Sequence, residues 1–352
     1  MPLTEKKFHN KVCFAAFLFS LMVVMIHSYN ADMFLALPAE GGASEVVWQF
    51  QHILADVLGP VAVPGFFMLS AYQFYRKCSY KDIGPKMERR IRTVLLPYLL
   101  WNFLYYLGYA AAGRIPYLAW ISDKTAVELS IPAMADAVLH FTYNPVFWYM
   151  YQLIFLLALS PLLHPLLKNR VSGILVIGAE LYCIKNLIQI PIVNMDALFY
   201  YSAAAYGALH AEDFLEERRL QGRKGTAVRA AAAVIGTVLA VYFYQGITVR
   251  HSVFETVLYR FTVPVTLWMA VPGMRLPDAR EWMKYGFFLY TIHFILARGI
   301  NKLGAALLPH SALTALLLYL AIPVICVILA WKLGEFLRKY AGPLWRVISG
   351  GR

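Results

Sequence analysis

The stretch VCFAAFLFSLMVVMIHS, residues 12–28, determines how the rest of the chain is interpreted. It contains no Asp, Glu, Lys or Arg, is long enough to cross a bilayer, and follows a basic leader containing Lys6, Lys7 and Lys11. Its penultimate residue is His27, roughly 24 Å beyond Lys11 along a helix that rises about 1.5 Å per residue. If Lys11 marks the inner interface, His27 lies in the outer part of the hydrocarbon layer. A titratable group there indicates either a functional residue or an anchor at the outer headgroups.

The composition identifies a polytopic membrane protein. The chain has 352 residues, of which 60% are hydrophobic and 15% charged, and its mean hydropathy is +0.57. This leaves too little polar surface for a soluble globule. The net charge of +12 does not indicate nucleic-acid binding, because the basic residues fall in short loops between apolar segments. The four cysteines are far apart in sequence, so we expect no disulfide framework and no metal site.

Ten apolar segments are long enough to cross a bilayer. They are residues 12–28, 53–75, 93–111, 146–167, 171–189, 195–211, 226–245, 254–272, 284–300 and 312–334. The fold predicted from them is an all-α transmembrane bundle of about ten spanning helices. We expect residues 1–352 to form a single transmembrane domain, because no segment between the spans is long enough for a soluble one.

The distribution of basic residues predicts the orientation of the bundle. When the loops are assigned to alternating sides, most of the 32 Lys and Arg residues fall on the side of the termini. The loops on the opposite side carry only Arg114, Lys124, Lys185, Arg250 and Lys302. Cytoplasmic loops are the ones enriched in Lys and Arg. We therefore predict cytoplasmic N- and C-termini and a multi-pass location in the cell membrane, most simply a bacterial plasma membrane.

Five stretches, in this order and spacing, together resemble the acyltransferase 3 family of integral membrane O-acyltransferases. They are SLMVVMIHS at 20–28, VPGFFMLSAYQFYRK at 63–77, RRIRTVLLPYLLWN at 89–102, VFWYMYQLIFLLALSPLL at 146–163 and FFLYTIHFIL at 287–296. They resemble, in turn, a first helix ending in histidine, a Phe-Phe-x-x-Ser-Gly segment with Ala71 in place of the glycine, an Arg-rich entry into a Pro-Tyr-x-x-Trp helix, a Trp-Tyr span, and a late helix with an Ile-Tyr-x-x-His pattern.

The resemblance implies a membrane enzyme that transfers an acyl group, with acetyl the expected one, from acyl-CoA to a hydroxyl. The acceptor it implies is a cell-surface glycan or a lipid-linked sugar, and no bound cofactor is expected. One position departs from the family. The arginine that commonly precedes the first-helix histidine by eleven residues is Ala16 here, and Lys11 is too far along the helix to be assumed to replace it. A degenerate member that only binds an acceptor is therefore an alternative.

His27 is the predicted general base, because a neutral imidazole can take the proton of a hydroxyl as it attacks a thioester. Asp56 is predicted at a similar depth and would orient the His27 ring, or would be solvated at the start of its helix. Arg260 and Arg298 lie inside apolar spans and are predicted in the outer third of the bilayer. They would stabilise an oxyanion or hold an anionic acceptor; otherwise they pair with Glu255 or extend to the headgroups.

The remaining candidates are substrate-binding residues, and each also has a structural interpretation. The arginines Arg89, Arg90 and Arg92 would bind CoA phosphates or would only set orientation. Trp148 and Tyr149 would stack on a sugar or would belong to the interfacial aromatic belt. Trp101 and Asn102 would line a donor channel or pack between helices. His293, near the middle of its span, would line an acyl passage or be structural.

A transporter or flippase of a lipid-linked precursor is the alternative from another functional class. In such a protein the same buried His, Arg and Glu residues would line a substrate path. Dependence on acyl-CoA separates the two, because a transporter moves its substrate without consuming a thioester.

Overall fold

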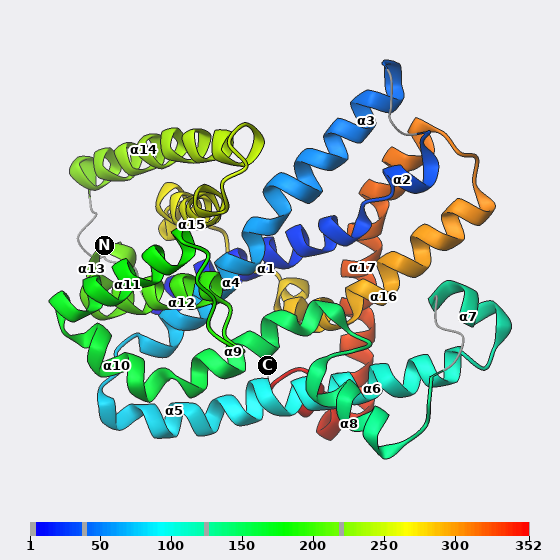
Figure 1. Ribbon diagram of the computed structural model, residues 1–352, viewed down its shortest axis with the longest axis horizontal. Helices are drawn as coiled ribbons and strands as arrows, with labels where there is room; N and C mark the ends of the chain where they lie inside the picture. The colour runs from blue at the N-terminus through cyan, green and yellow to red at the C-terminus, as the bar shows by residue number, and fades with distance from the viewer. Residues whose placement is uncertain (1–4, 37–40, 123–126, 218–221, 352) are drawn as a thin grey trace. The chain divides into compact units, whose positions relative to one another are not determined.

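The computed structural model describes residues 5–36, 41–122, 127–217 and 222–351, which form helices and turns without any strand (Figure 1). The helices are α1 Glu5–Ser28, α2 Ala31–Phe34, α3 Gly42–His52, α4 Ala62–Tyr75, α5 Ile83–Arg90, α6 Leu96–Ala112, α7 Pro116–Ser122, α8 Ile131–His140, α9 Trp148–Ala158, α10 Ser160–Lys168, α11 Arg170–Lys185, α12 Met195–His210, α13 Glu212–Leu215, α14 Gly222–Thr248, α15 Val253–Ala270, α16 Gly286–Leu307, α17 Ala312–Tyr340 and α18 Gly342–Ile348. The predicted all-α class is confirmed for these residues.

The helices group into two compact units that are interleaved along the chain. Unit 1 comprises Met1–Phe19, Val61–Glu88 and Gln152–Arg280, and unit 2 comprises Ser20–Pro60, Arg89–Tyr151 and Glu281–Arg352. Each unit therefore assembles segments that are distant in sequence.

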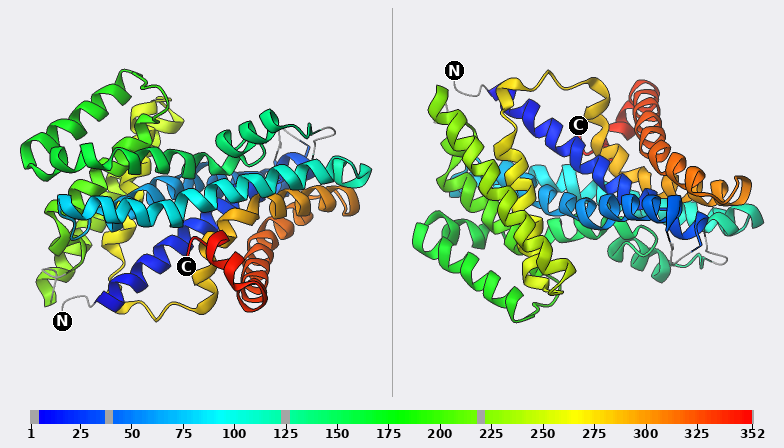
Figure 2. Two further views of the ribbon diagram at one scale, coloured as in Figure 1. Left: turned by 90° about the horizontal axis from the view of Figure 1, so that it is seen from below. Right: turned by 90° about the horizontal axis from the view of Figure 1, so that it is seen from above.

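Unit 1 is built on two helix pairs. α4 packs along α12. α14, in yellow-green, packs along α15, its neighbour in sequence (Figure 2, right). Glycines allow the close approach of α14 and α15, because a Cβ on Gly236 would collide with Thr266 and one on Gly246 with Glu255. Small residues are the usual means by which membrane helices approach closely.

In unit 2, α16 packs against α17, its neighbour in sequence, and α6 packs against α8. The short C-terminal helix α18 packs against both α17 and α6. Gly334 of α17 makes room here, since a Cβ at this position would collide with the rings of Tyr285 and Trp345. The indole of Trp345, which lies against Gly334, is buried.

The segment predicted as the fourth span is bent. Pro145–Ala158 and Ser160–Lys168 meet at an angle of 63°. Pro161 lies directly after the bend and has no backbone N–H to donate to the preceding turn. A proline in this position is a common cause of such a break.

Five helical segments of the described chain are long and apolar enough to cross a membrane, or six if the bent pair is counted as one span. They are Glu5–Phe34, Gly42–Tyr75, Tyr80–Ala112, Gly222–Thr248 and Ala312–Tyr340. Each of the ten predicted segments coincides with helix, but the count of ten spans, the single domain and the cytoplasmic termini stay predictions. Lys124, which entered the orientation argument, lies outside the described residues.

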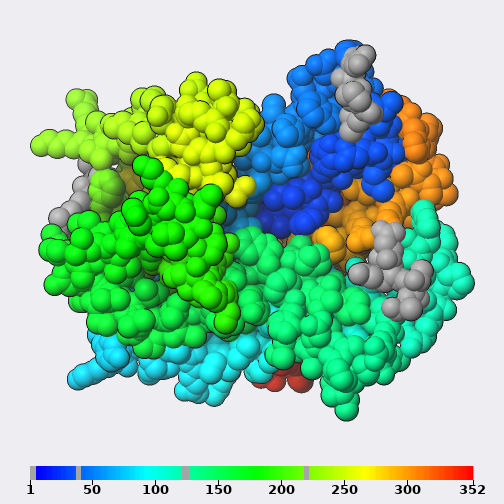
Figure 3. Space-filling model, viewed as in Figure 1, coloured from blue at the N-terminus to red at the C-terminus, as the bar shows by residue number. Residues whose placement is uncertain are grey.

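The apolar surface of α14 indicates contact with lipid. Only 6% of its most apolar 18-residue window is buried, and Val234, Ile235, Val238 and Val241 are all exposed. Figure 3 shows this helix, in yellow-green, at the surface. A soluble protein rarely exposes so continuous an apolar face. The chain is a multi-pass membrane protein.

Candidate functional site

The C-terminal end of α1 and the middle of α16 bring two histidines together in unit 2. His27 occupies the last turn of α1, and the centroid of its ring lies 5.2 Å from that of His293, with the ring planes 48° apart. The sequence analysis placed these residues in the first and last motifs of the family resemblance, with separate roles. The structure makes them neighbours.

His293 is fully buried, and its hydrogen bonding determines its tautomer. Its Nδ1 lies 2.7 Å from the backbone oxygen of Tyr290, which can only accept a hydrogen bond. Nδ1 therefore carries the proton in the neutral ring, and Nε2 carries a lone pair. Nε2 is buried and has no hydrogen-bond partner among the described residues. The structure thus leaves an unused acceptor inside the protein beside His27.

Aromatic rings enclose the histidine pair. Phe294 packs edge-on against His27, with the ring centroids 5.2 Å apart. Tyr290 packs on His293 and is stacked on Phe147, with ring centroids 5.6 Å apart. The Tyr290 hydroxyl donates to the backbone oxygen of Val146 at 2.5 Å, which fixes this ring. The surroundings of the pair are apolar and well packed.

A buried amide network follows directly after His27. The Gln51 side-chain oxygen accepts from the backbone N–H groups of Asn30 and Ala31 at 3.1 and 3.2 Å, and its nitrogen donates to Asn30 Oδ1 at 2.9 Å. Asn30 in turn donates to Asn301 Oδ1 at 3.1 Å, and Asn301 donates to the backbone oxygen of Ser28 at 3.2 Å. Asn301 lies eight residues after His293 on α16. The network therefore holds the end of α1 against α16 and fixes the spacing of the two histidines.

The structure does not place Asp56 on His27. Asp56 accepts instead from His52 Nδ1 at 2.8 Å, one turn earlier in the same helical segment, and both side chains are about half exposed. Among the described residues of unit 2, no group hydrogen-bonds the His27 ring. The predicted contact between Asp56 and His27 is therefore absent, and the solvated position, given above as the alternative, is the one observed.

Trp101 and Asn102 are buried in packing contacts of unit 2. The Trp101 indole N–H donates to the backbone oxygen of Ile348 at 2.9 Å. Asn102 donates to the backbone oxygen of Val138 at 3.2 Å, and its own side-chain oxygen is buried without a partner in the described chain. These contacts fit the structural interpretation of both residues, and their role in a donor channel stays a prediction.

The two aromatic residues that open α9 differ in exposure. Trp148 is 40% exposed, whereas Tyr149 is half-buried and packs edge-on against Tyr290, with ring centroids 6.0 Å apart. Tyr149 is thus connected through Tyr290 to the histidine pair, and Trp148 is the more exposed residue of the two. Sugar stacking by either residue stays a prediction.

The arginines Arg89, Arg90 and Arg92 lie where α5 gives way to the π-helical turn Ile91–Leu95. Arg89 and Arg92 are exposed and Arg90 is half-buried. This position, ahead of the apolar helix α6, leaves two guanidinium groups accessible. Phosphate binding by this cluster stays a prediction.

The two membrane arginines belong to different units. Arg298 lies on α16 of unit 2, five residues after His293 and about 7.5 Å further along the helix. Arg260 lies on α15 of unit 1. The proposed pairing of Arg260 with Glu255 is wrong, because Glu255 accepts instead from Arg250 Nε at 2.7 Å. The roles of Arg260 and Arg298 at His27 stay predictions.

Unit 1 contains a buried ionic cluster that the sequence analysis did not find. Lys11 donates to Glu217 at 2.6 Å and to the backbone oxygen of Trp268 at 2.7 Å. Arg76 pairs with Glu216 and Glu5, which raise the pKa of its guanidinium above the ordinary value. The Lys11–Glu217 and Arg76–Glu216 pairs join residues 206 and 140 positions apart, so no local sequence pattern predicts them. Because Lys11 is committed to Glu217, its ammonium is not available to replace the arginine missing at Ala16.

Comparison with known proteins supports the resemblance. The model of the acyltransferase 3 family, described as an acyltransferase domain, matches residues 17–332. The succinoglycan biosynthesis protein ExoH of Rhizobium meliloti (strain 1021) is 26% identical over 226 residues, which cover 63% of this chain and 59% of that protein. The match thus spans less than two thirds of the relative's length. No solved structure matches the chain. The family match extends over most of the sequence and contains both His27 and His293, and the chain belongs to the acyltransferase 3 family.

Proposed function

We propose that the protein is a membrane O-acyltransferase that transfers an acyl group, with acetyl the expected one, from acyl-CoA to a hydroxyl of a cell-surface polysaccharide or lipid-linked sugar. The observation that carries this proposal is the contact between His27 and the buried, partly unsatisfied ring of His293. Family membership supplies the reaction class. The name of the relative, a succinoglycan biosynthesis protein, supports a polysaccharide as the acceptor.

His27 acts as the general base in this proposal. Its neutral ring takes the proton of the acceptor hydroxyl while the hydroxyl oxygen attacks the thioester carbonyl carbon. The tetrahedral intermediate then collapses, the carbon–sulfur bond breaks, and the protonated His27 gives its proton to the CoA thiolate, which regenerates the neutral base. The products are an ester and free CoA. Proton transfer by a positioned side chain contributes about 10² to 10⁴ in rate.

His293 stabilises the cation that His27 becomes. Its Nδ1 proton is committed to the Tyr290 carbonyl, so its ring presents only a lone pair at Nε2. Such a ring, packed against His27 with the centroids 5.2 Å apart, favours the protonated state of the His27 imidazole. A second neutral histidine has this effect without placing a negative charge in the apolar core, which would be costly to bury. His293 is thus a positioning and electrostatic residue, and His27 is the catalytic one.

The donor enters from the side of the basic segment Arg89–Arg92 in this proposal. Guanidinium groups bind phosphate oxygens in pairs, and two of the three are exposed. The acceptor reaches His27 from the opposite side of the membrane, since the orientation argument places the end of α1 there. A bacterial plasma membrane is the location that fits both substrates.

The test compares ester-linked acyl groups on surface polysaccharide in cells that lack the protein, cells that express it, and cells that express His27→Ala. We expect acylation with the wild type and none above background with His27→Ala. His140→Ala is the matched control, because this exposed histidine of unit 2 bonds only Asp136 within its own helix.

Membrane insertion is checked for each variant by its yield in the isolated membrane fraction. If inserted His27→Ala protein supports the same acylation as the wild type, the proposal is wrong. If acylation is the same in cells with and without the protein, a transporter or a binding-only member of the family is favoured instead.

A further inference from the structure

Arg260 is a cation inside an apolar helix for which the described chain provides no ion pair or hydrogen bond. It lies seven residues into α15 and is half-buried among its neighbours. Glu255, one turn earlier, is engaged by Arg250. Asp196 influences Arg260 electrostatically but lies too far away to form an ion pair with it. Charged residues within membrane helices usually face a partner or a substrate path, so an external partner is expected for this guanidinium.

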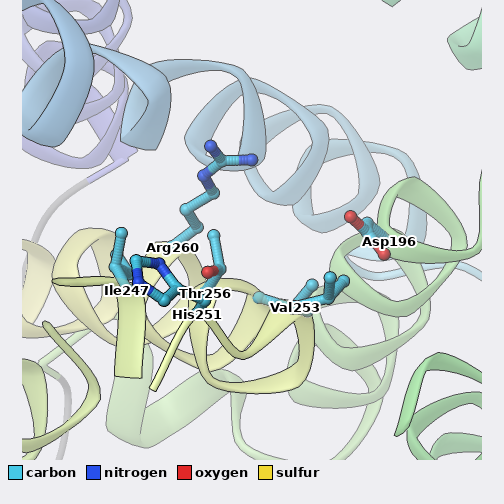
Figure 4. A pocket seen from close by; sticks show the side chains of 7 residues that line it. Asp196, Ile247, His251, Val253, Thr256 and Arg260 are labelled. Atoms are coloured by element: carbon cyan, nitrogen blue, oxygen red, sulfur yellow. The ribbon is translucent and has the colours of Figure 1, made fainter. Parts of the chain in front are cut away.

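Arg260 faces a pocket formed within unit 1 (Figure 4). The pocket has a volume of about 370 Å³, within the range of roughly 300 to 1,000 Å³ found for small-molecule sites. Its polar lining consists of Asp196, His251, Thr256 and Arg260, and its apolar lining includes Ile247 and Val253. In Figure 4 Arg260 rises from α15 while Asp196 stands apart on α12, which leaves room between the two charges.

The helices around this pocket are fixed by specific contacts. The Tyr200 hydroxyl of α12 donates to the backbone oxygen of Val257 on α15 at 3.2 Å. The rings of Phe199 and Phe261 pack between the same two helices with centroids 5.3 Å apart. At the α14–α15 corner, Ser252 N–H donates to the backbone oxygen of Gly246 at 2.8 Å. The pocket therefore lies between packed helices and a tight corner, and the helices that carry its polar side chains are held in place.

We propose that this pocket binds an anionic sugar, with the acid group on Arg260 and the sugar hydroxyls on Asp196 and Thr256. A guanidinium forms paired hydrogen bonds with phosphate or carboxylate oxygens. The Asp196 carboxylate accepts hydrogen bonds only, which suits hydroxyl groups. The Thr256 hydroxyl donates to the backbone oxygen of Ser252 at 2.9 Å, so its lone pairs remain to accept from a sugar hydroxyl. A simple anion would gain nothing from Asp196, which would repel it.

This binding site is separate from the proposed acyl-transfer site, because it contains neither histidine of the pair. Its occupancy can be measured without turnover. The shared chemistry is a sugar bearing a phosphate or carboxylate. Such a group occurs on a lipid-linked sugar phosphate and on an acidic residue of a free polysaccharide, and the two sources are distinguished experimentally.

The experiment measures equilibrium binding of radiolabelled glucose 1-phosphate to the full chain in lipid nanodiscs. We expect Arg260→Gln to weaken binding about tenfold or more, as loss of a charge-assisted hydrogen bond does. Arg275→Gln is the matched control, since it removes an exposed arginine of unit 1 that does not line the pocket, and we expect binding within about twofold of the wild type. Arg260→Lys retains the charge and should retain part of the affinity, which covers the case in which Arg260→Gln folds poorly.

Competition identifies the source of the ligand. Stronger displacement by polyprenyl-diphosphate-linked glucose indicates a lipid-linked sugar, and stronger displacement by a glucuronate-containing oligosaccharide indicates a free acidic glycan. Either result supports the site. Equal binding of glucose 1-phosphate to the wild type and to folded Arg260→Gln would overturn it, as would inorganic phosphate competing as well as the sugar phosphate.

Discussion

The histidine pair of unit 2 and the arginine pocket of unit 1 differ in the charges that surround them. Around His27 and His293 the protein presents rings, amides and backbone carbonyls, and no carboxylate in the described part of the chain is hydrogen-bonded to either imidazole. Around Arg260 it presents separated charges facing a cavity. A base needs a neutral ring ready to accept a proton, whereas a binding site for an acid group needs a permanent cation. Under the two proposals, proton transfer and recognition of an acid group therefore fall to different residues.

The buried ion pair of unit 1 should give the largest effect on stability. Lys11→Met leaves Glu217 buried without its cation, and breaking such a pair costs about 3–5 kcal/mol. The side chains are only 4% and 7% exposed, so water cannot replace the lost partner. Thermal unfolding of the purified protein in detergent measures the change.

The double variant Lys11→Met with Glu217→Gln removes both charges and should recover most of this loss. If Lys11→Met alone unfolds at the wild-type temperature, the Lys11–Glu217 pair contributes nothing to the stability of unit 1.

Substitution of His293 by another aromatic residue separates the chemical role of its imidazole from its role in packing. His293→Phe keeps a ring of similar size but removes the Nε2 acceptor, and we expect the acyl-transfer rate to fall about 10²-fold, the lower end of general-base effects. Transfer from acyl-CoA by protein in nanodiscs measures the rate, with yield and melting temperature as the folding check. A well-folded His293→Phe protein with the wild-type rate would reduce His293 to a packing residue.

The amide network beside His27 should give a moderate effect on stability and a secondary one on activity. Asn301→Leu leaves Asn30 without its side-chain acceptor, and an unsatisfied buried polar group costs about 1–3 kcal/mol. The variant should melt earlier and transfer acyl groups more slowly, because the end of α1 loses its contact with α16. Unchanged melting and unchanged transfer would show that the network does not fix the histidine spacing.

The smallest effect is expected at Asp56. It bonds His52 in an exposed pair four residues apart, and such pairs contribute about 0.3–0.5 kcal/mol. Asp56→Asn should therefore change the transfer rate by less than about threefold, an amount that corresponds to under 1 kcal/mol. A loss comparable to that of the His27 variant would restore Asp56 as the orienting group.

The sequence predicts the all-α class and singles out both histidines, with different expected roles, because apolar length and short motifs are local properties. The sequence also contains the signal that would have corrected the prediction for Asp56. His52 precedes Asp56 by four residues, which places both on one helix face. The contact between His27 and His293 joins residues 266 positions apart, and the Lys11–Glu217 pair is nearly as distant. Such contacts depend on how helices pack, which apolar patterning in a membrane helix specifies poorly.

The role of Arg260 shows a second limit of sequence reasoning. Its presence in an apolar span is visible in the sequence. Whether its guanidinium pairs with Glu255 or faces an open pocket depends on the corner between α14 and α15. There Gly246 and Ser252 bring Arg250 to Glu255 and leave Arg260 facing the cavity. Asp196 and His251 join it from α12 and from the corner, and neither belongs to a motif.

The most direct test of the account is transfer of radiolabelled acetyl from acetyl-CoA to isolated polysaccharide by the purified chain in nanodiscs, compared between the wild type and His27→Ala. The account predicts CoA release and polysaccharide labelling by the wild type, and a rate lower by about 10² to 10⁴ in the variant. Labelling of the polysaccharide at the wild-type rate by correctly folded His27→Ala protein would contradict it.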